Sequence, residues 1–340
     1  MPASPVPERG MSTVLAPDAP DRPAPLAAPP SFTIVIPTYQ AASTVRAAVE
    51  SALAQVHPAA EIVVVDDGST DDVEGALGGL RDRVTLIRKE NGGGASALNA
   101  GAEAANGDFL AILDADDAYH PRRLQALGRL AAERPDLDLI TTDARFVVDG
   151  EAVGTFADYN PFAVGDQRAA ILQTCFVGGW PAVRLARLRE IGGFDERLRT
   201  GYDWDCWLRL ILAGARAGLV AEPLYDYRLH PASLTASRAA TLWDRVRLLE
   251  QVRVDRRLTA QERRVLRASL RTHRTRAVEA EVEAALVGTS PRRPLLRLAL
   301  APGLGRRARA RAVIAAVAPS LARRLVRAEP APAQRLRVHA

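Results

Sequence analysis

The sequence predicts an α/β protein with a mostly parallel, doubly wound sheet, helices on both faces and a C-terminal helical extension. Short apolar runs alternate with helical patterns through the first 120 residues. These runs are continuously apolar, which is typical of parallel strands buried on both faces. Beyond residue 240 the pattern changes to arginine-rich helices. Together these features indicate one Rossmann-like unit followed by a basic helical region.

Four strands are expected in the first third of the chain, at residues 33–36, 61–65, 84–87 and 108–113. Pro37 ends the first of them. Ser43 is expected to cap a helix that runs to about Val56, and a second helix is expected over residues 95–105. Right-handed crossovers bring the carboxyl ends of parallel strands to one edge of the sheet, where ligands bind in such folds.

We expect three regions along the chain. Residues 1–30 are rich in Pro and Ala, which predicts a disordered tail, and they lack the hydrophobic core of a signal peptide. Residues 31–235 form the globular domain, with halves at 31–120 and 121–235. Residues 236–340 form a basic helical extension. No stretch approaches the roughly 20 apolar residues that a transmembrane helix needs.

Composition narrows the function classes. The two cysteines, Cys175 and Cys206, lie in apolar contexts, which argues against a disulfide scaffold and a cysteine-ligated zinc site. Residues 241–340 carry 23 Arg and no Lys against 8 acidic residues. Segment 306–326 places Val313, Val317, Leu321 and Leu325 opposite arginines. This pattern is compatible with peripheral membrane contact and equally with packing against the globular domain.

An acidic cluster follows the fourth expected strand. Asp114, Asp116 and Asp117 come directly after the apolar run 109–113. Clustered carboxylates repel one another, and hard oxygen ligands suit Mg²⁺ or Mn²⁺. Asp116 is the first-choice metal ligand and Asp114 the second. The alternative is a solvated, Asp-rich turn.

Several motifs occur in an order that resembles a known family. They read IVIPTY at 34–39, VVDDGSTD at 64–71, NGG to NAG across 91–101 and LDADD at 113–117, followed by IGGFDE at 191–196, DWDCWLR at 203–209 and YRLH at 227–230. Together they resemble the bacterial family 2 glycosyltransferases, which are inverting enzymes with the GT-A fold. The resemblance covers about residues 31–235. No Gln-x-x-Arg-Trp signature of the processive members occurs, which favours a non-processive enzyme.

The resemblance implies a nucleotide-diphosphate sugar donor and a divalent cation, Mg²⁺ or Mn²⁺. Tyr39 and Asp67 match positions that contact the base, and Pro37 and Asn99 lie in matching motifs on the nucleotide side. Asp114 and Asp116 match positions that hold the metal and touch the ribose, and Asp114 could serve either. On the residues alone, Tyr39 could instead be a core tyrosine and Asp67 a turn residue.

Asp203 is the candidate general base for the acceptor hydroxyl. It is expected to begin a helix whose apolar face is formed by Trp204, Trp207, Leu208 and Ile211. The alternative is a capping box in which Thr200 and Asp203 only close the helix end. Many relatives carry Glu before this aspartate, whereas here the residue is Tyr202. Asp205 is a fallback base on another face of the helix.

Two residues near the end of the globular domain could act on phosphate or metal. Arg228 could pair with the diphosphate, and His230 could ligate the metal or contact phosphate, although a lone histidine is more often structural. Residues 178–180 read Gly-Gly-Trp. Trp180 could stack on an acceptor sugar, and a packing role is equally compatible.

The sequence therefore predicts metal-assisted, inverting sugar transfer to a glycan, a lipid-linked saccharide or a cell-envelope polysaccharide precursor, with no nucleic-acid partner. We expect a cytoplasmic protein, with peripheral contact at the inner membrane face through the basic helices. The alternatives are a nucleotide-sugar-binding or membrane-docking module without turnover, and a sugar-phosphate nucleotidyltransferase. The latter needs a Gly-rich phosphate loop after the first strand, where residues 37–40 read PTYQ. Donor sugar, base and acceptor are not specified by these motifs.

Overall fold

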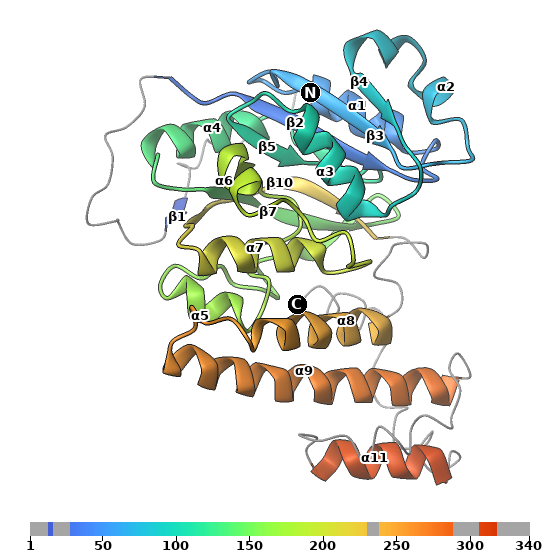
Figure 1. The fold of residues 1–340 in the computed structure, drawn as a ribbon. Helices are drawn as coiled ribbons and strands as arrows, with labels where there is room; N and C mark the ends of the chain where they lie inside the picture. Colours follow the sequence, from blue (N-terminus) through green and yellow to red (C-terminus); the bar gives the residue numbers. More distant parts are fainter. Residues whose placement is uncertain (1–12, 16–27, 230–237, 288–305, 318–340) are drawn as a thin grey trace, which may run out of the picture.

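The computed structural model describes residues 13–15, 28–229, 238–287 and 306–317. Its centre is a mostly parallel sheet with the strand order β1-β10-β7-β9-β5-β2-β3-β4, and β6 and β8 pair with β10 and β7 (Figure 1). The strands are β1 (Thr13–Leu15), β2 (Phe32–Thr38), β3 (Glu61–Asp66), β4 (Thr85–Arg88), β5 (Phe109–Ile112), β6 (Ala118–Tyr119), β7 (Leu139–Val148), β8 (Glu151–Thr155), β9 (Ala182–Arg184) and β10 (Ala217–Arg228).

The four predicted strands are confirmed as β2 to β5. β3 and β5 pair in parallel with β2, and β4 pairs in parallel with β3. Their carboxyl ends therefore lie on one edge of the sheet, as predicted. The antiparallel strand β9 separates β5 from β7, so the parallel order is interrupted there.

Helices cover both faces of the sheet, which confirms the doubly wound architecture. Val35, Val63 and Val65 point to the face covered by α3 and α7, whereas the alternate residues Ile34 and Val64 pack with α1 and α4 on the other. These helices and the shorter ones of the globular domain are α1 (Val45–Leu53), α2 (Val73–Leu77), the 3-10 turn η1 (Gly78–Arg83), α3 (Gly94–Ala104), α4 (Arg123–Glu133), α5 (Gln167–Ile171), α6 (Leu185–Glu190) and α7 (Tyr202–Leu212).

Helix α3 approaches the sheet closely because its inner face is small. A Cβ atom added at Gly101 would lie 2.3 Å from Cγ1 of Val35, so only glycine fits there. The helix that begins near Ser43 differs from its prediction. Thr44 is the N-cap and makes no side-chain capping bond. The helix also ends before Val56, whose N–H donates to the Pro121 carbonyl at 2.8 Å.

The expectation of a disordered tail over residues 1–30 is wrong at Thr13–Leu15, which form β1 and pair antiparallel with β10. Residues 28–30 are also described, and the remainder of that segment lies outside the described residues. Backbone groups at the edge of a sheet offer hydrogen bonds to any extended segment, whatever its composition. The pairing therefore had no signal in the Pro/Ala-rich sequence.

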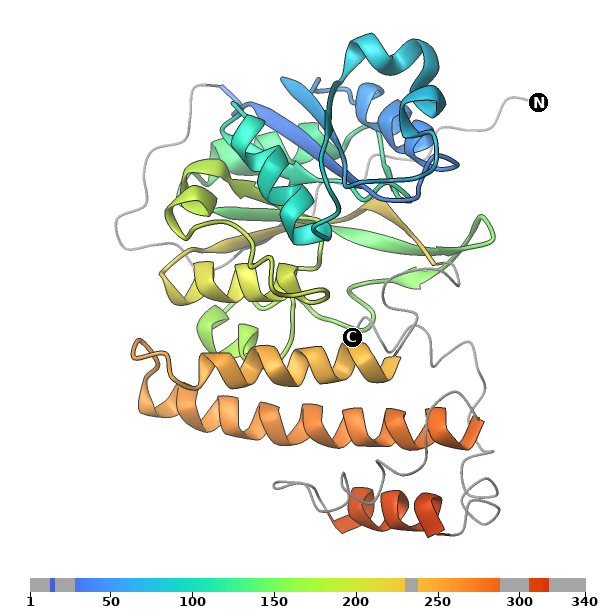
Figure 2. The same ribbon diagram turned by 45° about the vertical axis from the view of Figure 1, so that its right-hand side comes forward.

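Three helices follow the globular domain: α8 (Arg238–Val252), α9 (Ala260–Val287) and α11 (Arg306–Val317). Figure 2 shows α8 beneath α7 and α9 beneath α8. The first two of these helices each bury an apolar face. Leu242, Val246 and Leu249 of α8 are buried, and so are Leu266 and Leu270 of α9. Most of these side chains continue the core that covers α7.

Helix α11 turns a different face inward from the one predicted. Ala312 and Ala315 are buried, whereas Val313 is 42% exposed. Alanine allows close helix packing against α9, and such small residues do not form the stripe of large apolar side chains on which the prediction was based. Leu321 and Leu325 lie outside the described residues. Within the described ranges, no helix combines the length and apolar character that crossing a membrane demands.

Candidate active site

The turns after β2, β3 and β5 meet at one edge of the sheet. Tyr39 follows β2 and is 54% exposed, which excludes the core-tyrosine alternative and leaves its ring face open to a ligand. Pro37 does not end the first strand as predicted: it lies within β2 opposite Val65 of β3, the pairing continues to Thr38, and Pro37 is half-buried. Gln40 ties the first two turns together, because its side-chain oxygen accepts a hydrogen bond from the Thr70 N–H at 3.2 Å.

The second turn contains two buried aspartates with different partners. Asp66 Oδ1 accepts the Ser69 N–H at 2.9 Å, so the turn function belongs to Asp66. Asp67 Oδ1 accepts from Lys89 Nζ at 2.8 Å and from the Gly92 N–H at 2.9 Å, and Oδ2 accepts from the Gly93 N–H at 2.7 Å. Asp67 therefore fixes the loop that leads into α3.

No sequence motif assigned Lys89 to the site. It directly follows β4, which pairs in parallel with β3, so it lies on the same edge as Asp67. Its position directly after a predicted strand is the feature of the sequence that could have identified Lys89 as a site residue. An ionised carboxylate has about four lone-pair sites. Asp67 thus keeps acceptor capacity beyond its three protein donors, and its contact with a nucleotide base stays a prediction.

The acidic turn after β5 divides into structural and open carboxylates. Asp117 is 1% exposed, and its Oδ2 accepts from the Tyr225 hydroxyl at 2.7 Å while its Oδ1 accepts from the Arg228 N–H at 2.8 Å. These bonds join the turn to β10. Asp114 and Asp116 keep part of their surface exposed. The solvated-turn alternative is wrong for Asp117, which is enclosed by β10.

The carboxylates of two distant segments lie close enough for their charges to interact. Burial, and then the charges of Asp116 and Asp203, raise the pKa of Asp114 to about 7. Burial also raises the pKa of Asp203. The pKa of Tyr202 is raised by burial and then by Asp114, Asp203 and Asp116. Asp203 of α7 and the turn after β5 therefore form one cluster of acidic groups.

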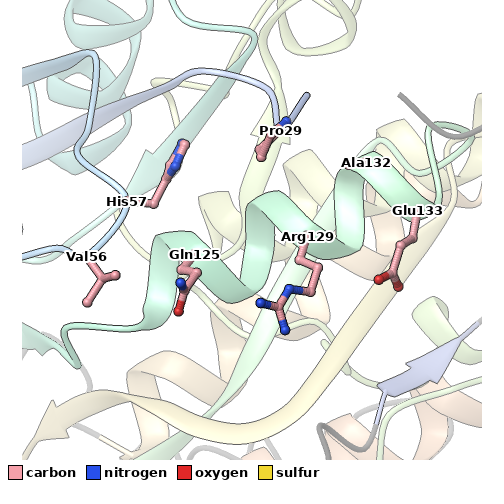
Figure 3. Close-up of a pocket in the computed structure, with 7 residues that line it drawn as sticks. All are labelled: Pro29, Val56, His57, Gln125, Arg129, Ala132 and Glu133. Atoms are coloured by element: carbon pink, nitrogen blue, oxygen red, sulfur yellow. The ribbon is translucent and has the colours of Figure 1, made fainter. Parts of the chain in front are cut away.

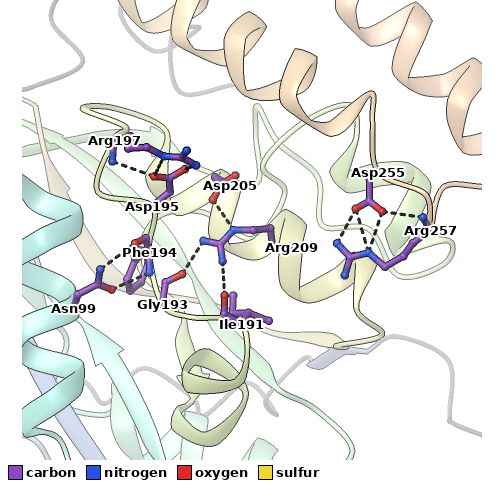
Figure 4. Close-up of polar contacts among 10 residues, drawn as sticks. All are labelled: Asn99, Ile191, Gly193, Phe194, Asp195, Arg197, Asp205, Arg209, Asp255 and Arg257. Atoms are coloured by element: carbon purple, nitrogen blue, oxygen red, sulfur yellow. Dashed lines mark hydrogen bonds and ion pairs between the residues drawn. The ribbon is translucent and has the colours of Figure 1, made fainter.

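The start of α7 bears on the two interpretations of Asp203, as a general base or as a capping-box residue. Gly201 is the N-cap with φ 72°, and the Thr200 hydroxyl donates to Asp244 Oδ2 at 2.6 Å, so the predicted capping box does not form. The predicted apolar face is buried. Asp205, the fallback base, is paired with Arg209 Nε at 2.7 Å (Figure 4). Asp203 is therefore the carboxylate of α7 whose charge acts on Asp114 in the turn after β5.

Asn99 bonds to a neighbouring loop of the protein. Its Oδ1 accepts the Phe194 N–H at 2.8 Å, and its Nδ2 donates to the Phe194 carbonyl at 2.9 Å and to Glu196 Oε1 at 2.8 Å (Figure 4). Arg209 holds the same loop through the Gly193 carbonyl at 2.7 Å. The amide of Asn99 thus anchors the loop 191–196 to α3, and a nucleotide contact by this residue stays a prediction.

Trp180 is a packing residue. It is 4% exposed, its Nε1 donates to the Thr142 carbonyl at 3.0 Å, and its ring stacks on Tyr225 at 5.1 Å between centroids. Stacking on an acceptor sugar is therefore wrong for this side chain. The preceding glycine lies at the site, because a Cβ atom added at Gly179 would lie 3.2 Å from Asp203 Oδ2.

The residues fit a cation in part. Asp114 and Asp116 offer oxygen ligands from one turn, and their mutual charge raises the pKa of Asp114, an effect that a bound cation would reverse. Mg²⁺ is usually held by one or two carboxylates together with substrate phosphates. His230 lies outside the described residues. Among the described residues, the acidic cluster included, no group of three or more His, Cys, Asp or Glu side chains is placed to hold a metal.

Arg228 ends β10 and is half-buried, with its N–H on Asp117. Its side chain stays a predicted partner for phosphate. A separate surface pocket of about 360 Å³ contains none of the site residues (Figure 3). It is lined by Pro29, Val56, His57, Gln125, Arg129, Ala132 and Glu133.

Comparisons with known proteins agree with this geometry. Residues 33–187 match the family described as "Glycosyl transferase family 2". The succinoglycan biosynthesis protein ExoU of Rhizobium meliloti is 32% identical over 231 residues, covering 62% of this chain and 66% of that protein. An uncharacterized glycosyltransferase of Rickettsia typhi is 29% identical over 216 residues, covering 61% and 66%. The chain thus spans slightly less than two thirds of either relative.

Solved structures share the fold at low sequence identity. Residues 1–349 of TarS from S. aureus, in complex with UDP-GlcNAc, superpose with a TM-score of 0.60 at 17% identity, covering 91% of this chain and 89% of that one. A mannosyltransferase from Pyrobaculum calidifontis, in complex with GDP-Man and Mn²⁺, gives a TM-score of 0.58 at 21% identity, covering 91% and 92%. These likenesses establish the same α/β architecture with a C-terminal helical region.

Proposed function

Because this chain belongs to glycosyl transferase family 2, we propose that it transfers a sugar from a nucleotide-diphosphate donor to a hydroxyl acceptor with inversion. One observation carries the proposal. The charges of Asp116 and of Asp203 on α7 act on Asp114 in the turn after β5, at the sheet edge where Tyr39 and Asp67 also lie. This arrangement supports donor binding by the turns after β2 and β3 and proton transfer at Asp203.

The donor side is formed by the turns after β2 and β3. The exposed ring of Tyr39 offers a face on which a nucleotide base can stack. Asp67 offers a fixed carboxylate edge to a base N–H, because three protein donors hold it in place. Structural neighbours bind UDP-GlcNAc and GDP-Man, which supports a nucleotide sugar as the donor class.

Asp116 and Asp114 would hold Mg²⁺ or Mn²⁺ against the diphosphate. A divalent cation at this place would offset the negative charge that the diphosphate gains as its bond to the sugar breaks. Asp114 could also accept a hydrogen bond from the ribose. The mannosyltransferase neighbour was solved with Mn²⁺, which supports a divalent ion as the cofactor class.

Asp203 would take the proton of the acceptor hydroxyl as the acceptor oxygen attacks the sugar. The bond from the anomeric carbon to the diphosphate breaks, the nucleoside diphosphate leaves, and the configuration inverts. A helix N-terminus lowers the pKa of a nearby carboxylate, but burial outweighs that influence and raises the pKa of Asp203. A higher pKa makes the carboxylate a better proton acceptor near neutral pH.

The acceptor is proposed to be a saccharide or a lipid-linked saccharide. Two relatives are named succinoglycan biosynthesis proteins, which supports a polysaccharide precursor. Gly179 adds no side chain beside the carboxylate, since a Cβ atom there would lie 3.2 Å from Asp203 Oδ2. This supports the approach of an acceptor hydroxyl to Asp203 at this point.

A panel of nucleotide sugars tests the proposal. UDP-GlcNAc, UDP-glucose, UDP-galactose and GDP-mannose are incubated with the protein in Mg²⁺, Mn²⁺ or EDTA, and release of UDP or GDP is measured. We expect metal-dependent release from at least one donor, lost in Asp203→Asn. Asp82→Asn is the matched control, since Asp82 is an exposed residue of η1, which leads into the end of β4 opposite the site.

Two results would contradict the proposal. Donor binding without nucleotide release would indicate a binding module. Formation of a nucleotide sugar from a sugar phosphate and a nucleoside triphosphate would indicate a nucleotidyltransferase.

A further inference from the structure

Helix α8 contacts the segment that presents Asp203. The Thr200 hydroxyl, two residues before α7, donates to Asp244 Oδ2 of α8 at 2.6 Å. A Cβ atom added at Gly201, the N-cap of α7, would lie 3.8 Å from Cδ1 of Leu248. Both views show α8 running beside α7 (Figures 1 and 2). The first turn of α7 therefore rests on the C-terminal helices.

Arg245 of α8 reaches the residue next to Asp203. Its guanidinium carbon lies 5.8 Å from the ring centroid of Trp204. Trp204 is 2% exposed and donates its indole N–H to the Ile171 carbonyl at 2.8 Å, and its ring lies 5.5 Å from that of His273 on α9. Elements α5, α8 and α9 thus enclose the side chain that follows the candidate base.

The charges around Asp203 come from several elements. Arg245 of α8 lowers the pKa of Asp203, and Asp205 on the same helix raises it. Asp203 in turn acts on Asp114 after β5, on Tyr202 and on the thiol of Cys175, whose pKa is raised chiefly by burial. The carboxylate of Asp203 raises the pKa of Arg245 against the larger effect of burial. The two charges therefore act on each other within a partly buried environment.

We propose that α8 is part of the catalytic site, in which Arg245 and the Asp244–Thr200 hydrogen bond are positioning elements for the Asp203 carboxylate. The proposal rests on the proposed function, since it takes Asp203 as the base. It assigns the C-terminal helices a role in catalysis, and this role requires neither a membrane nor a partner protein. Loss of Arg245 should mainly reduce turnover, because the groups proposed to bind the donor lie in the turns after β2, β3 and β5.

The test compares Arg245→Met, Arg245→Lys and Thr200→Val with the control Arg267→Met, an exposed arginine of α9. Release of UDP or GDP is measured with the panel donor that the unchanged protein turns over, together with the melting temperature. For Arg245→Met we expect kcat to fall about 10- to 100-fold with the donor KM changed less than about twofold, since small displacements of a reacting group cost rates of this order. Arg245→Lys should recover part of the loss.

Amide hydrogen exchange at residues 201–205 gives a second measurement that needs no turnover. We expect faster exchange there in Arg245→Met and Thr200→Val than in Arg267→Met. Equal kcat and equal exchange in Arg245→Met and Arg267→Met would overturn the inference. If Arg245→Met fails to fold, Arg245→Lys and Thr200→Val decide by the same criteria. If the unchanged protein releases no nucleotide from any donor, the proposed function fails, and exchange alone decides whether α8 holds α7.

Discussion

Asp67 belongs to the proposed donor side and Asp203 is the proposed base, and the surroundings of the two carboxylates differ. Asp67 is held by Lys89 and two backbone N–H groups, so its charge is balanced before any ligand arrives. Asp203 faces Asp114, and burial raises the pKa of both carboxyls. The donor side is thus organised by protein hydrogen bonds alone. The acidic cluster is organised for ligands that bring protons or positive charge.

The largest effect should come from the acidic cluster. Asp203→Asn keeps the size of the side chain and removes the proton acceptor, so kcat should fall about 10²- to 10⁴-fold. The donor KM should change little, because the donor side has other contacts. Steady-state release of UDP or GDP measures both. A variant with more than a tenth of normal kcat would show that Asp203 is not the base.

Removal of the cation should be next in size. We expect EDTA to lower nucleotide release by about 100-fold, and added Mn²⁺ or Mg²⁺ to restore it. Asp116→Asn should raise the metal concentration needed for half-maximal rate, whereas Asp82→Asn should not. Titration of the rate with each metal gives these values. Full activity in EDTA would mean that the cluster works without a divalent ion.

Acid should weaken the helical support of Asp203. Burial lowers the pKa of His273 to about 4 from an ordinary 6.5, and its Nδ1 has no hydrogen-bond partner among the described residues. The unfolded chain therefore binds a proton at higher pH than the folded one, so stability is complete above about pH 6.5 and declines as pH falls toward 4. The shift corresponds to about 3 kcal/mol.

Denaturant unfolding between pH 7.5 and pH 4 measures this decline. His273→Gln should lose less stability over the same window, by about 3 kcal/mol. Parallel curves for the two proteins would show that His273 is not the titrating group.

The smallest effect should come from the donor side. Lys89→Met removes one of three donors to Asp67 and leaves the two backbone N–H groups, so the free energy of unfolding should fall by about 2 kcal/mol. The donor KM should rise more than kcat falls, because the loop 89–93 borders the donor side. Arg264→Met, at an exposed position on α9, is the control. A pure kcat effect would place Lys89 nearer the reacting atoms than the donor side.

The sequence predicted the parallel half of the fold closely, because apolar runs that end in polar turns report strands and their common edge directly. It also predicted the buried face of α7. These depend on local patterns or on strand-end geometry.

Other features depend on contacts that no local pattern encodes. Asn99 and Asp117 lie in motifs that suggest ligand binding, yet they bond to loop 191–196 and to β10. The sequence was compatible with Trp180 stacking on an acceptor sugar or packing in the core, and its stacking on Tyr225 in the structure shows the core role. Arg245 could not be assigned from the sequence, since it is one arginine among the many of the C-terminal region.

The pairing of Lys89 with Asp67 has a practical consequence, because Lys89 is the only lysine in the chain. Amine-directed reagents such as fluorescent esters, acetylating agents and coupling resins therefore have one side chain to react with, and it lies at the donor side. A label placed there would report binding at the proposed donor side. Attachment of the protein to a surface through this side chain would, for the same reason, obstruct that side.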